Sequence, residues 1–262
     1  MRTFWTSIYI VAILCGSAAS DLTINTSIKA GSPTTPDQAP FGTGDIGSIV
    51  RAAADVWESL IQDNVTVNIE YEWFEHPVAT GLGRTNLGVN PPLISFDTDT
   101  LWFLDSTPAD HSEYDPMQTD MTGALSTGKY FAATPGVAFS GFDLFSVALH
   151  EIGHVLAGGA FPPAGITVTS PRPAAGLMIA TTTDSHLNST LYPEALMVDS
   201  IDPGHRRLVS DYDLLAVAQT RGFSSVSAVP EPSAAIYLSV IGAVATSVSV
   251  YRKRSRLTRR EA

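Results

Sequence analysis

The alternation of hydrophobic and polar residues predicts a helix and a strand close together in the first third of the chain. Residues 45–62 place apolar side chains at helical spacing, and Asp45 is positioned to cap the first turn. Residues 65–73 alternate between apolar and polar side chains, which is typical of a strand with one buried face. Two shorter apolar runs, 93–98 and 101–105, predict neighbouring strands joined by a tight turn.

Two more helices are predicted in the second half of the chain. Apolar residues recur at helical spacing through residues 142–156, and the glycines and prolines that follow exclude further helix for about twenty residues. Ser210, followed three residues later by Asp213, indicates a short capped helix near the end. Residues 21–44 and 106–128 are polar and predict irregular segments. This mixture of elements favours an α+β fold.

The first twenty residues have the pattern of a secretory signal peptide. The basic residue Arg2 precedes an apolar run, and small side chains lead to a cleavage site before Asp21. Residues 1–20 are therefore expected to direct export. The single cysteine, Cys15, lies in this segment, so the exported domain has no thiol for a disulfide, a metal ligand or a cysteine-switch form of latency.

Residues 224–262 are predicted to form a linker and a sorting segment, in which 234–250 is an uncharged span at the short limit for a membrane helix. The basic tail 251–262 is expected to stay cytoplasmic. The motif before the span consists of Val229, Pro230, Glu231 and Pro232. Together these features resemble the PEP-CTERM sorting signal of exopolysaccharide-producing Gram-negative bacteria. The resemblance implies that an exosortase-like enzyme removes a transient membrane anchor and leaves the domain at the cell surface or in the extracellular matrix. A permanent single-pass anchor is the alternative.

Charge limits the partners of the exported part. Residues 21–230 hold 8 basic and 24 acidic side chains, a formal charge of −16. A surface of this charge repels nucleic acid and anionic membranes, so no nucleic-acid partner is expected. Binding of Ca²⁺ is compatible with this composition, but the sequence points to no particular loop.

The sequence H-E-x-x-H at residues 150–154 carries the candidate chemistry. On a helix, His150 and His154 lie one turn apart on one face, so both rings can bind a single Zn²⁺. Glu151 then lies beside the metal, where it can act as a general base. Chance alone gives about 0.005 such matches in this composition. Gly153 within the helix indicates the close approach of another chain segment.

A catalytic zinc needs a third protein ligand. The sequence leaves several candidates for this ligand, which are His76, His111, His186, His205, Asp184, Glu194, Asp199 and Asp202.

Residues 194–197, Glu-Ala-Leu-Met, resemble the Met-turn of metzincin proteases. Met197 follows His186 by eleven residues, the interval found in the leishmanolysin-like branch, and His186 follows His154 by 32 residues. In the compact metzincins a third histidine stands where this chain has Ala160. The resemblance therefore implies His186 as the third zinc ligand and Met197 as the Met-turn residue, with His205 or Glu194 as alternative ligands.

The similarity to metzincins and related secreted bacterial zinc proteases covers residues 45–223 and includes the terminal helix. It implies a metalloprotease-like domain over residues 21–223, with a twisted mixed sheet and an active-site helix. The expected activity is zinc-dependent endopeptidase hydrolysis of protein or peptide substrates, with Glu151 as general base. The alternative is a non-catalytic zinc-binding module at the cell surface or in the matrix.

Overall fold

Three helices and a set of short sheets make up the described part of the computed structural model, which comprises residues 22–75, 81–133, 135–136, 138–169, 174–227 and 229. The predicted signal peptide, His76, Pro230, Glu231, Pro232, the hydrophobic span and the basic tail lie outside these residues. Within the described ranges, no helix combines the length and the apolar character that a membrane crossing requires. The mixed α and β fold predicted from the sequence is confirmed.

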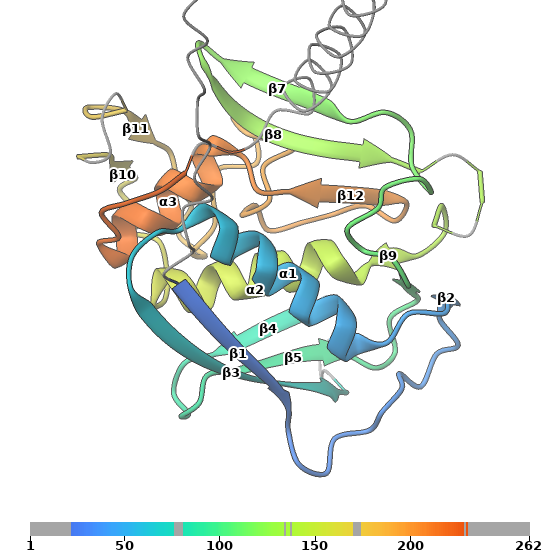
Figure 1. The fold of residues 1–262 in the computed structure, drawn as a ribbon. Coiled ribbons are helices and arrows are strands. Elements are labelled where there is room, and N and C mark those ends of the chain that lie inside the picture. The colour runs from blue at the N-terminus through green and yellow to red at the C-terminus, as the bar shows by residue number, and fades with distance from the viewer. Residues whose placement is uncertain are drawn as a thin grey trace, which may run out of the picture.

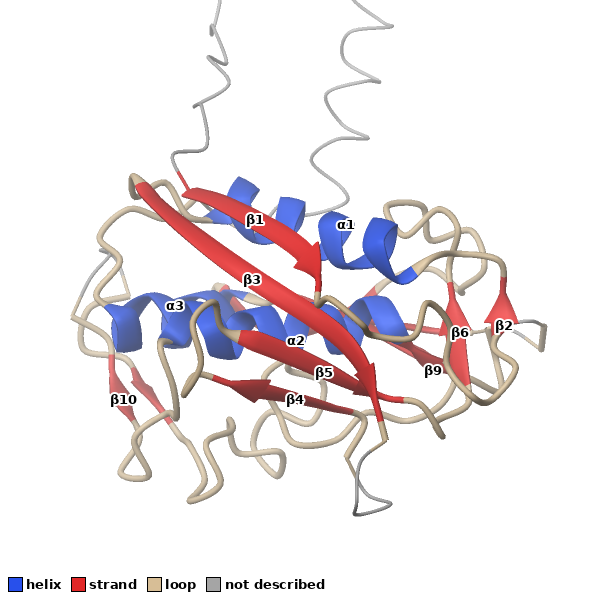
Figure 2. Cartoon of the chain, turned by 90° about the horizontal axis from the view of Figure 1, so that it is seen from below, coloured by secondary structure: helices blue, strands red, loops and turns tan. Residues whose placement is uncertain are grey.

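The main sheet has the strand order β1-β3-β5-β4. Its strands are β1 (Leu22–Ile28), β3 (Val65–Phe74), β5 (Leu93–Asp97) and β4 (Gly83–Asn86). The first three run parallel, whereas β4 is antiparallel to β5 and forms one edge. The sheet is therefore mixed, as the sequence predicted. Figures 1 and 2 show α1 (Ile46–Leu60) and α2 (Leu144–Ala157) together on one face of it.

Helix α1 forms where the apolar periodicity predicts it. The side chain of Asp45 accepts a hydrogen bond from the Ser48 amide and so caps the first turn. Its apolar face is buried, and Trp57 at the centre donates from Nε1 to the Leu149 carbonyl oxygen of α2 at 2.9 Å. This bond and the surrounding apolar contacts hold the two helices in a fixed register.

Two smaller sheets complete the fold (Figure 1). The first lies across α2 from the main sheet, and the second lies at the start of α2. One has the order β12-β8-β7, and its strands are β7 (Gln118–Thr122), β8 (Leu125–Ala132) and β12 (His205–Leu208). The other has the order β2-β6-β9, and its strands are β2 (Phe41–Gly42), β6 (Trp102–Leu104) and β9 (Phe142–Asp143). Helix α3 (Asp211–Arg221) follows β12 and packs against α2 and β8.

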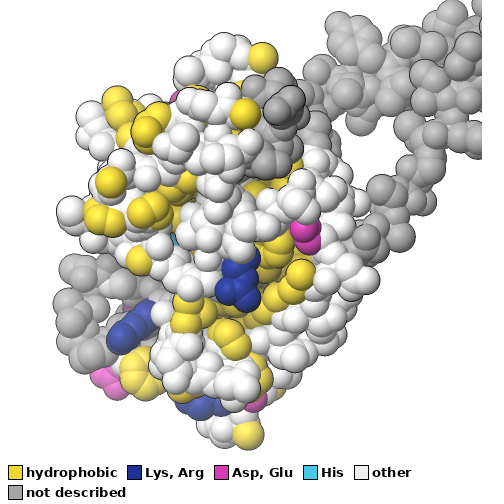
Figure 3. Space-filling view, turned by 90° about the vertical axis from the view of Figure 1, so that its left-hand side faces the viewer, with side chains coloured by type: hydrophobic (Ala, Val, Ile, Leu, Met, Phe, Trp, Pro, Cys, Tyr) yellow, Lys and Arg dark blue, Asp and Glu magenta, His cyan; other side chains and the backbone are white. Residues whose placement is uncertain are grey.

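The remaining pair, β10 (Ile166–Thr167) and β11 (Met178–Ile179), comes between α2 and His186 in the chain, and β10 contacts α3. Figure 3 views the side of the molecule that carries this pair, and its surface shows groups of hydrophobic side chains with few charged ones. Met178 of β11 is among the exposed apolar side chains of the domain. The large acidic excess of the chain is thus not spread evenly over its surface.

Three predictions about strands are wrong. Residues 21–44 contain β1, which pairs with β3 from Leu22↔Val65 onward, and residues 106–128 contain β7 and the start of β8. The partner of β1 lies far along the chain, so no local pattern announces their pairing. β7 pairs with the adjacent strand β8, but its side chains are mostly exposed and show no hydrophobic pattern. The strands predicted at 93–98 and 101–105 both form, as β5 and β6, but they belong to different sheets.

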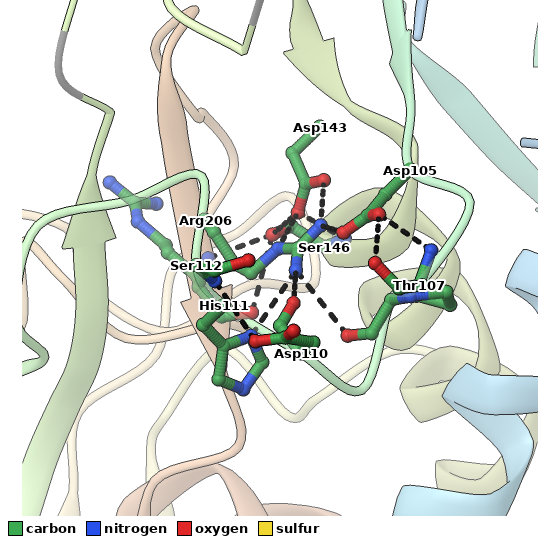
Figure 4. Close-up of polar contacts among 10 residues, drawn as sticks. Asp105, Thr107, Asp110, His111, Ser112, Asp143, Ser146 and Arg206 are labelled. Atoms are coloured by element: carbon green, nitrogen blue, oxygen red, sulfur yellow. Dashed lines mark hydrogen bonds and ion pairs between the residues drawn. The ribbon is translucent and has the colours of Figure 1, made fainter. Parts of the chain in front are cut away.

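A buried arginine fixes the start of α2 (Figure 4). Arg206 of β12 is fully buried, and its Nη2 lies 2.8 Å from both Asp105 Oδ2 and Asp143 Oδ1. Asp143 is also the N-cap of α2, since it accepts a hydrogen bond from the Ser146 amide at 3.1 Å. One carboxylate therefore ties the helix to the sheet through Arg206. His111 Nδ1 lies 3.2 Å from Arg206 Nη1, and burial, followed by this cation, lowers the pKa of His111.

Replacing Arg206 by methionine should destabilise the domain strongly, because Asp105 and Asp143 would remain buried without their cation. Removing one partner of a buried ion pair costs about 3–5 kcal/mol in the free energy of unfolding. Urea denaturation measures this loss. Arg221→Met, on the exposed last turn of α3, is the control and should cost less than about 1 kcal/mol. Equal losses in the two variants would show that the buried ion pair contributes no more to the free energy of unfolding than an exposed arginine does.

Candidate metal centre

Three histidine rings converge at one point. His154 Nε2 lies 3.0 Å from His150 Nε2 and 3.4 Å from His186 Nε2. The three ligand atoms all fall within 4.8 Å of one another, which is close enough for one metal ion to bind them all. Neutral imidazole nitrogens that face one another repel unless a proton or a cation lies between them. The donor set therefore fits a cation, and three imidazoles are compatible with zinc.

This is the one group of three potential metal-ligand residues among those that the structure describes. The sequence left Ca²⁺ binding possible without a location, and the described residues show no second cluster of this kind that would locate it. His150 and His154 come from successive turns of α2, as their spacing predicted, and His186 comes from a turn 32 residues later.

The orientation of the His150 ring is set by the backbone. Its Nδ1 lies 2.8 Å from the Leu196 carbonyl oxygen, which can only accept, so Nδ1 carries the proton and Nε2 keeps its lone pair for a metal. Leu196 immediately precedes Met197, so the segment that resembles a Met-turn is the one that holds this ring.

Met197 packs directly against α2 beneath the histidines. The side chain of Met197 is fully buried, and a Cβ atom placed on Gly153 would lie 2.5 Å from its sulfur and 3.2 Å from the Trp57 ring. Only glycine leaves room for this contact. The close approach of another segment that Gly153 indicated is therefore real, and the approaching segment is the turn at Met197.

Asp213 fixes this turn from below. Its carboxylate accepts hydrogen bonds from the amides of Leu196 at 3.1 Å and Met197 at 2.9 Å. The same carboxylate accepts from the amide and hydroxyl groups of Ser210, at 2.9 and 2.6 Å, and completes the capping box of α3. Burial raises the pKa of Asp213, while these four donors act in the opposite direction. The N-terminus of α3, the Met197 turn and His150 are thus connected through a single side chain.

None of the other described candidate ligands joins the three histidines in the cluster. Glu194 pairs with Arg207 at 3.3 Å, and His205 opens β12 opposite Ala132 of β8. His111 belongs to the Arg206 cluster. Asp184 Oδ1 lies 3.5 Å from His186 Nδ1, on the side of the ring away from the cluster. Asp199 and Asp202 are exposed and outside the cluster.

Glu151 lies at the junction of two cavities. One has a volume of about 510 Å³ and the other about 330 Å³, and both are lined by Gly83, Glu151 and His186. Glu151 is only 5% exposed, and Thr85 Oγ1 donates to its Oε2 at 2.6 Å. A Cβ atom on Gly83 would come within 2.9 Å of Glu151 Oε1. The edge strand β4 therefore borders the carboxylate closely, and no sequence pattern indicated a role for Gly83 or Thr85.

No protein-family model matches the chain, and no curated protein matches it significantly.

The packing of Met197 on α2 can be tested by Gly153→Ala. The added methyl group must displace the sulfur, which costs about 1–3 kcal/mol, more than the roughly 0.5–1 kcal/mol that alanine contributes in a helix. A net loss is expected in thermal or urea unfolding. The loss should be smaller when the same change is made together with Met197→Ala, and an unchanged loss in that background would rule out the proposed contact as its cause.

The three histidines should make the metal-free protein sensitive to mild acid. Burial, followed by the neighbouring His150 and His186, lowers the pKa of His154 to about 2, and burial lowers the pKa values of His150 and His186. The unfolded chain binds protons at these residues from about pH 6.5, and the folded chain only at lower pH. The free energy of unfolding should therefore decrease as the pH falls from about 7.5 to about 5.5. Urea unfolding in the presence of a chelator measures this slope, which His154→Gln should make shallower; identical slopes would contradict the explanation.

Proposed function

We propose that the protein is an exported zinc-dependent endopeptidase, a metzincin-like enzyme with leishmanolysin-type spacing of its ligands. The observation that carries the proposal is the convergence of His150, His154 and His186 beside Glu151, where two cavities meet. The three imidazoles would hold a zinc ion, which polarises a peptide carbonyl and makes a water molecule more acidic when it is bound.

Glu151 is suited to be the general base. It follows a ligand residue directly on α2, so its carboxylate lies at the metal centre without joining the cluster of nitrogens. Its carboxylate, oriented by the hydrogen bond from Thr85, would accept the proton of the attacking water and then pass it to the leaving amine. Burial of the carboxylate beside β4 limits its rotation, which keeps it in position for both transfers.

The edge strand β4 supports a peptide as the substrate. It is antiparallel at the edge of the main sheet, and its residues line both cavities beside Glu151. An extended peptide can add to such an edge by main-chain hydrogen bonds. Because Glu151 lines both cavities, a bound chain can extend beyond the carboxylate into each of them, which favours cleavage within a chain over removal of a terminal residue.

The non-catalytic alternative is less well supported. A structural zinc site uses four protein ligands, whereas a catalytic site keeps one position open. Among the described residues, the cluster contains three ligand side chains, and it opens onto two cavities.

The proposed route is export followed by transient anchoring. The residues that precede the predicted sorting motif are fastened to the domain, since the Ser227 amide donates to the Leu60 carbonyl oxygen at 2.8 Å. Val229, the first residue of that motif, is buried. The folded domain therefore reaches the first residue of the motif, and an exosortase-like enzyme would recognise the motif and remove the tail that follows it.

The proposal predicts one zinc ion per chain and peptide hydrolysis that a chelator abolishes and zinc restores. Glu151→Gln should retain zinc but lower kcat by about 100- to 10,000-fold, because it removes the general base. His186→Ala should weaken zinc binding. Metal analysis and a fluorogenic peptide assay measure these effects, and Glu75→Gln, an exposed change elsewhere, is the matched control. Full hydrolysis by Glu151→Gln would overturn the mechanism, and a wild-type protein without zinc would overturn the function.

A further inference from the structure

The third histidine sits in a turn with an unusual backbone. Ser185, directly before His186, has φ +80°, and it is the single non-glycine residue with a positive φ in the described part of the chain. Such conformations cost about 1–3 kcal/mol and persist where the surroundings enforce them, often at functional sites. Here the Thr182 amide donates to the His186 carbonyl oxygen at 2.9 Å, and the His186 amide lies 3.3 Å from Thr182 Oγ1. These two contacts close the turn around Ser185.

The turn brings a carboxylate behind the His186 ring. Asp184 Oδ1 lies 3.5 Å from His186 Nδ1, the nitrogen that points away from His150 and His154. Nδ1 is shielded from solvent and makes no direct hydrogen bond to the described residues. The Thr182 hydroxyl donates to the same Asp184 oxygen and thereby directs the carboxylate. A small shift of this half-exposed side chain would complete a hydrogen bond to the ring.

The two other histidines of the cluster are held in place by the backbone or by α2, whereas His186 is not. His150 is oriented by the Leu196 carbonyl within the buried Met197 turn, and His154 shares α2 with it. His186 comes from a separate turn and has no equivalent backbone acceptor at Nδ1 in the described structure. A carboxylate behind a metal-binding imidazole fixes the protonated nitrogen and makes the other nitrogen a better ligand.

We propose that Asp184 is a positioning residue that accepts the Nδ1 proton of His186 and holds Nε2 toward the metal. This inference rests on the proposed metal centre and gives a second role to a residue that the sequence suggested only as a ligand. The side chain of Asp184 is 55% exposed and lines the smaller cavity. The residue that positions the third ligand therefore lies at the surface of that cavity.

The test is the dissociation constant of Zn²⁺, measured by competition with a chromophoric chelator on the full chain. Asp184→Asn should weaken binding by about 10- to 100-fold, the usual effect of removing such a partner. Asp184→Glu should restore part of the loss. Asp55→Asn is the matched control, because Asp55 is 64% exposed and is paired with Arg51 at 2.8 Å far from the metal centre; it should leave zinc binding unchanged.

A second measurement separates positioning from folding of the turn. The melting temperature of the metal-free Asp184→Asn protein should equal that of the wild type, while the increase in melting temperature on adding zinc should be smaller. Equal zinc affinity in Asp184→Asn and wild type, with His186→Ala impaired, would overturn this inference and leave the proposed function intact. A lower melting temperature in the metal-free variant that accounts for the whole effect would also overturn it. Failure of the wild type to bind zinc would overturn both.

Discussion

The hydrogen bonds to the buried carboxylate of Asp213 are the constraint on which the candidate metal centre depends. They join the start of α3 to the amides of Leu196 and Met197, and the Leu196 carbonyl then orients His150. At the start of α2, Arg206 and Asp143 fix the first turn through a buried ion pair. The helix that supplies two of the three histidines is thus held at its N-terminus by buried charge, at His150 by the Leu196 carbonyl, and along its length by apolar contacts. A network of this kind rigidifies a site only because every member is satisfied.

Local periodicity was sufficient for much of the fold. The helices at 46–60, 144–157 and 211–221 and the long strand β3 lie close to where their patterns predicted them, because each carries its own apolar face and caps. The strands β1 and β7 were missed, and β5 and β6 were wrongly paired. For β1 and β6 the partner strands lie far away in the sequence, and a local pattern cannot specify them. For β7 the partner is the adjacent strand β8, but the mostly exposed side chains of β7 show no hydrophobic pattern.

The residues of the candidate site also divide into those that a local pattern predicts and those that depend on contacts between distant segments. His150, Glu151 and His154 were predicted from helix geometry alone, and Gly153 correctly indicated a close neighbour. His186 required a resemblance, since nothing in a histidine 32 residues away identifies it as a partner. Gly83 and Thr85 were not predictable, because β4 is a short edge strand without a hydrophobic pattern and meets Glu151 only in three dimensions. The proposed role of Asp184 depends on the positive φ of Ser185, which no pattern in the sequence predicts.

Because Val229 is buried in the domain, the chain between it and the predicted hydrophobic span limits the distance from the domain to the membrane while the tail remains attached. Only residues 230–233 separate Val229 from the predicted hydrophobic span, and four residues extend by at most about 14 Å. A compact domain of about 200 residues has a radius of gyration of about 16 Å, so this reach is less than the width of the domain. As long as the tail is retained, the proposed active site would reach only polymers close to the membrane surface. It would reach substrates farther from the membrane only after the tail is cut.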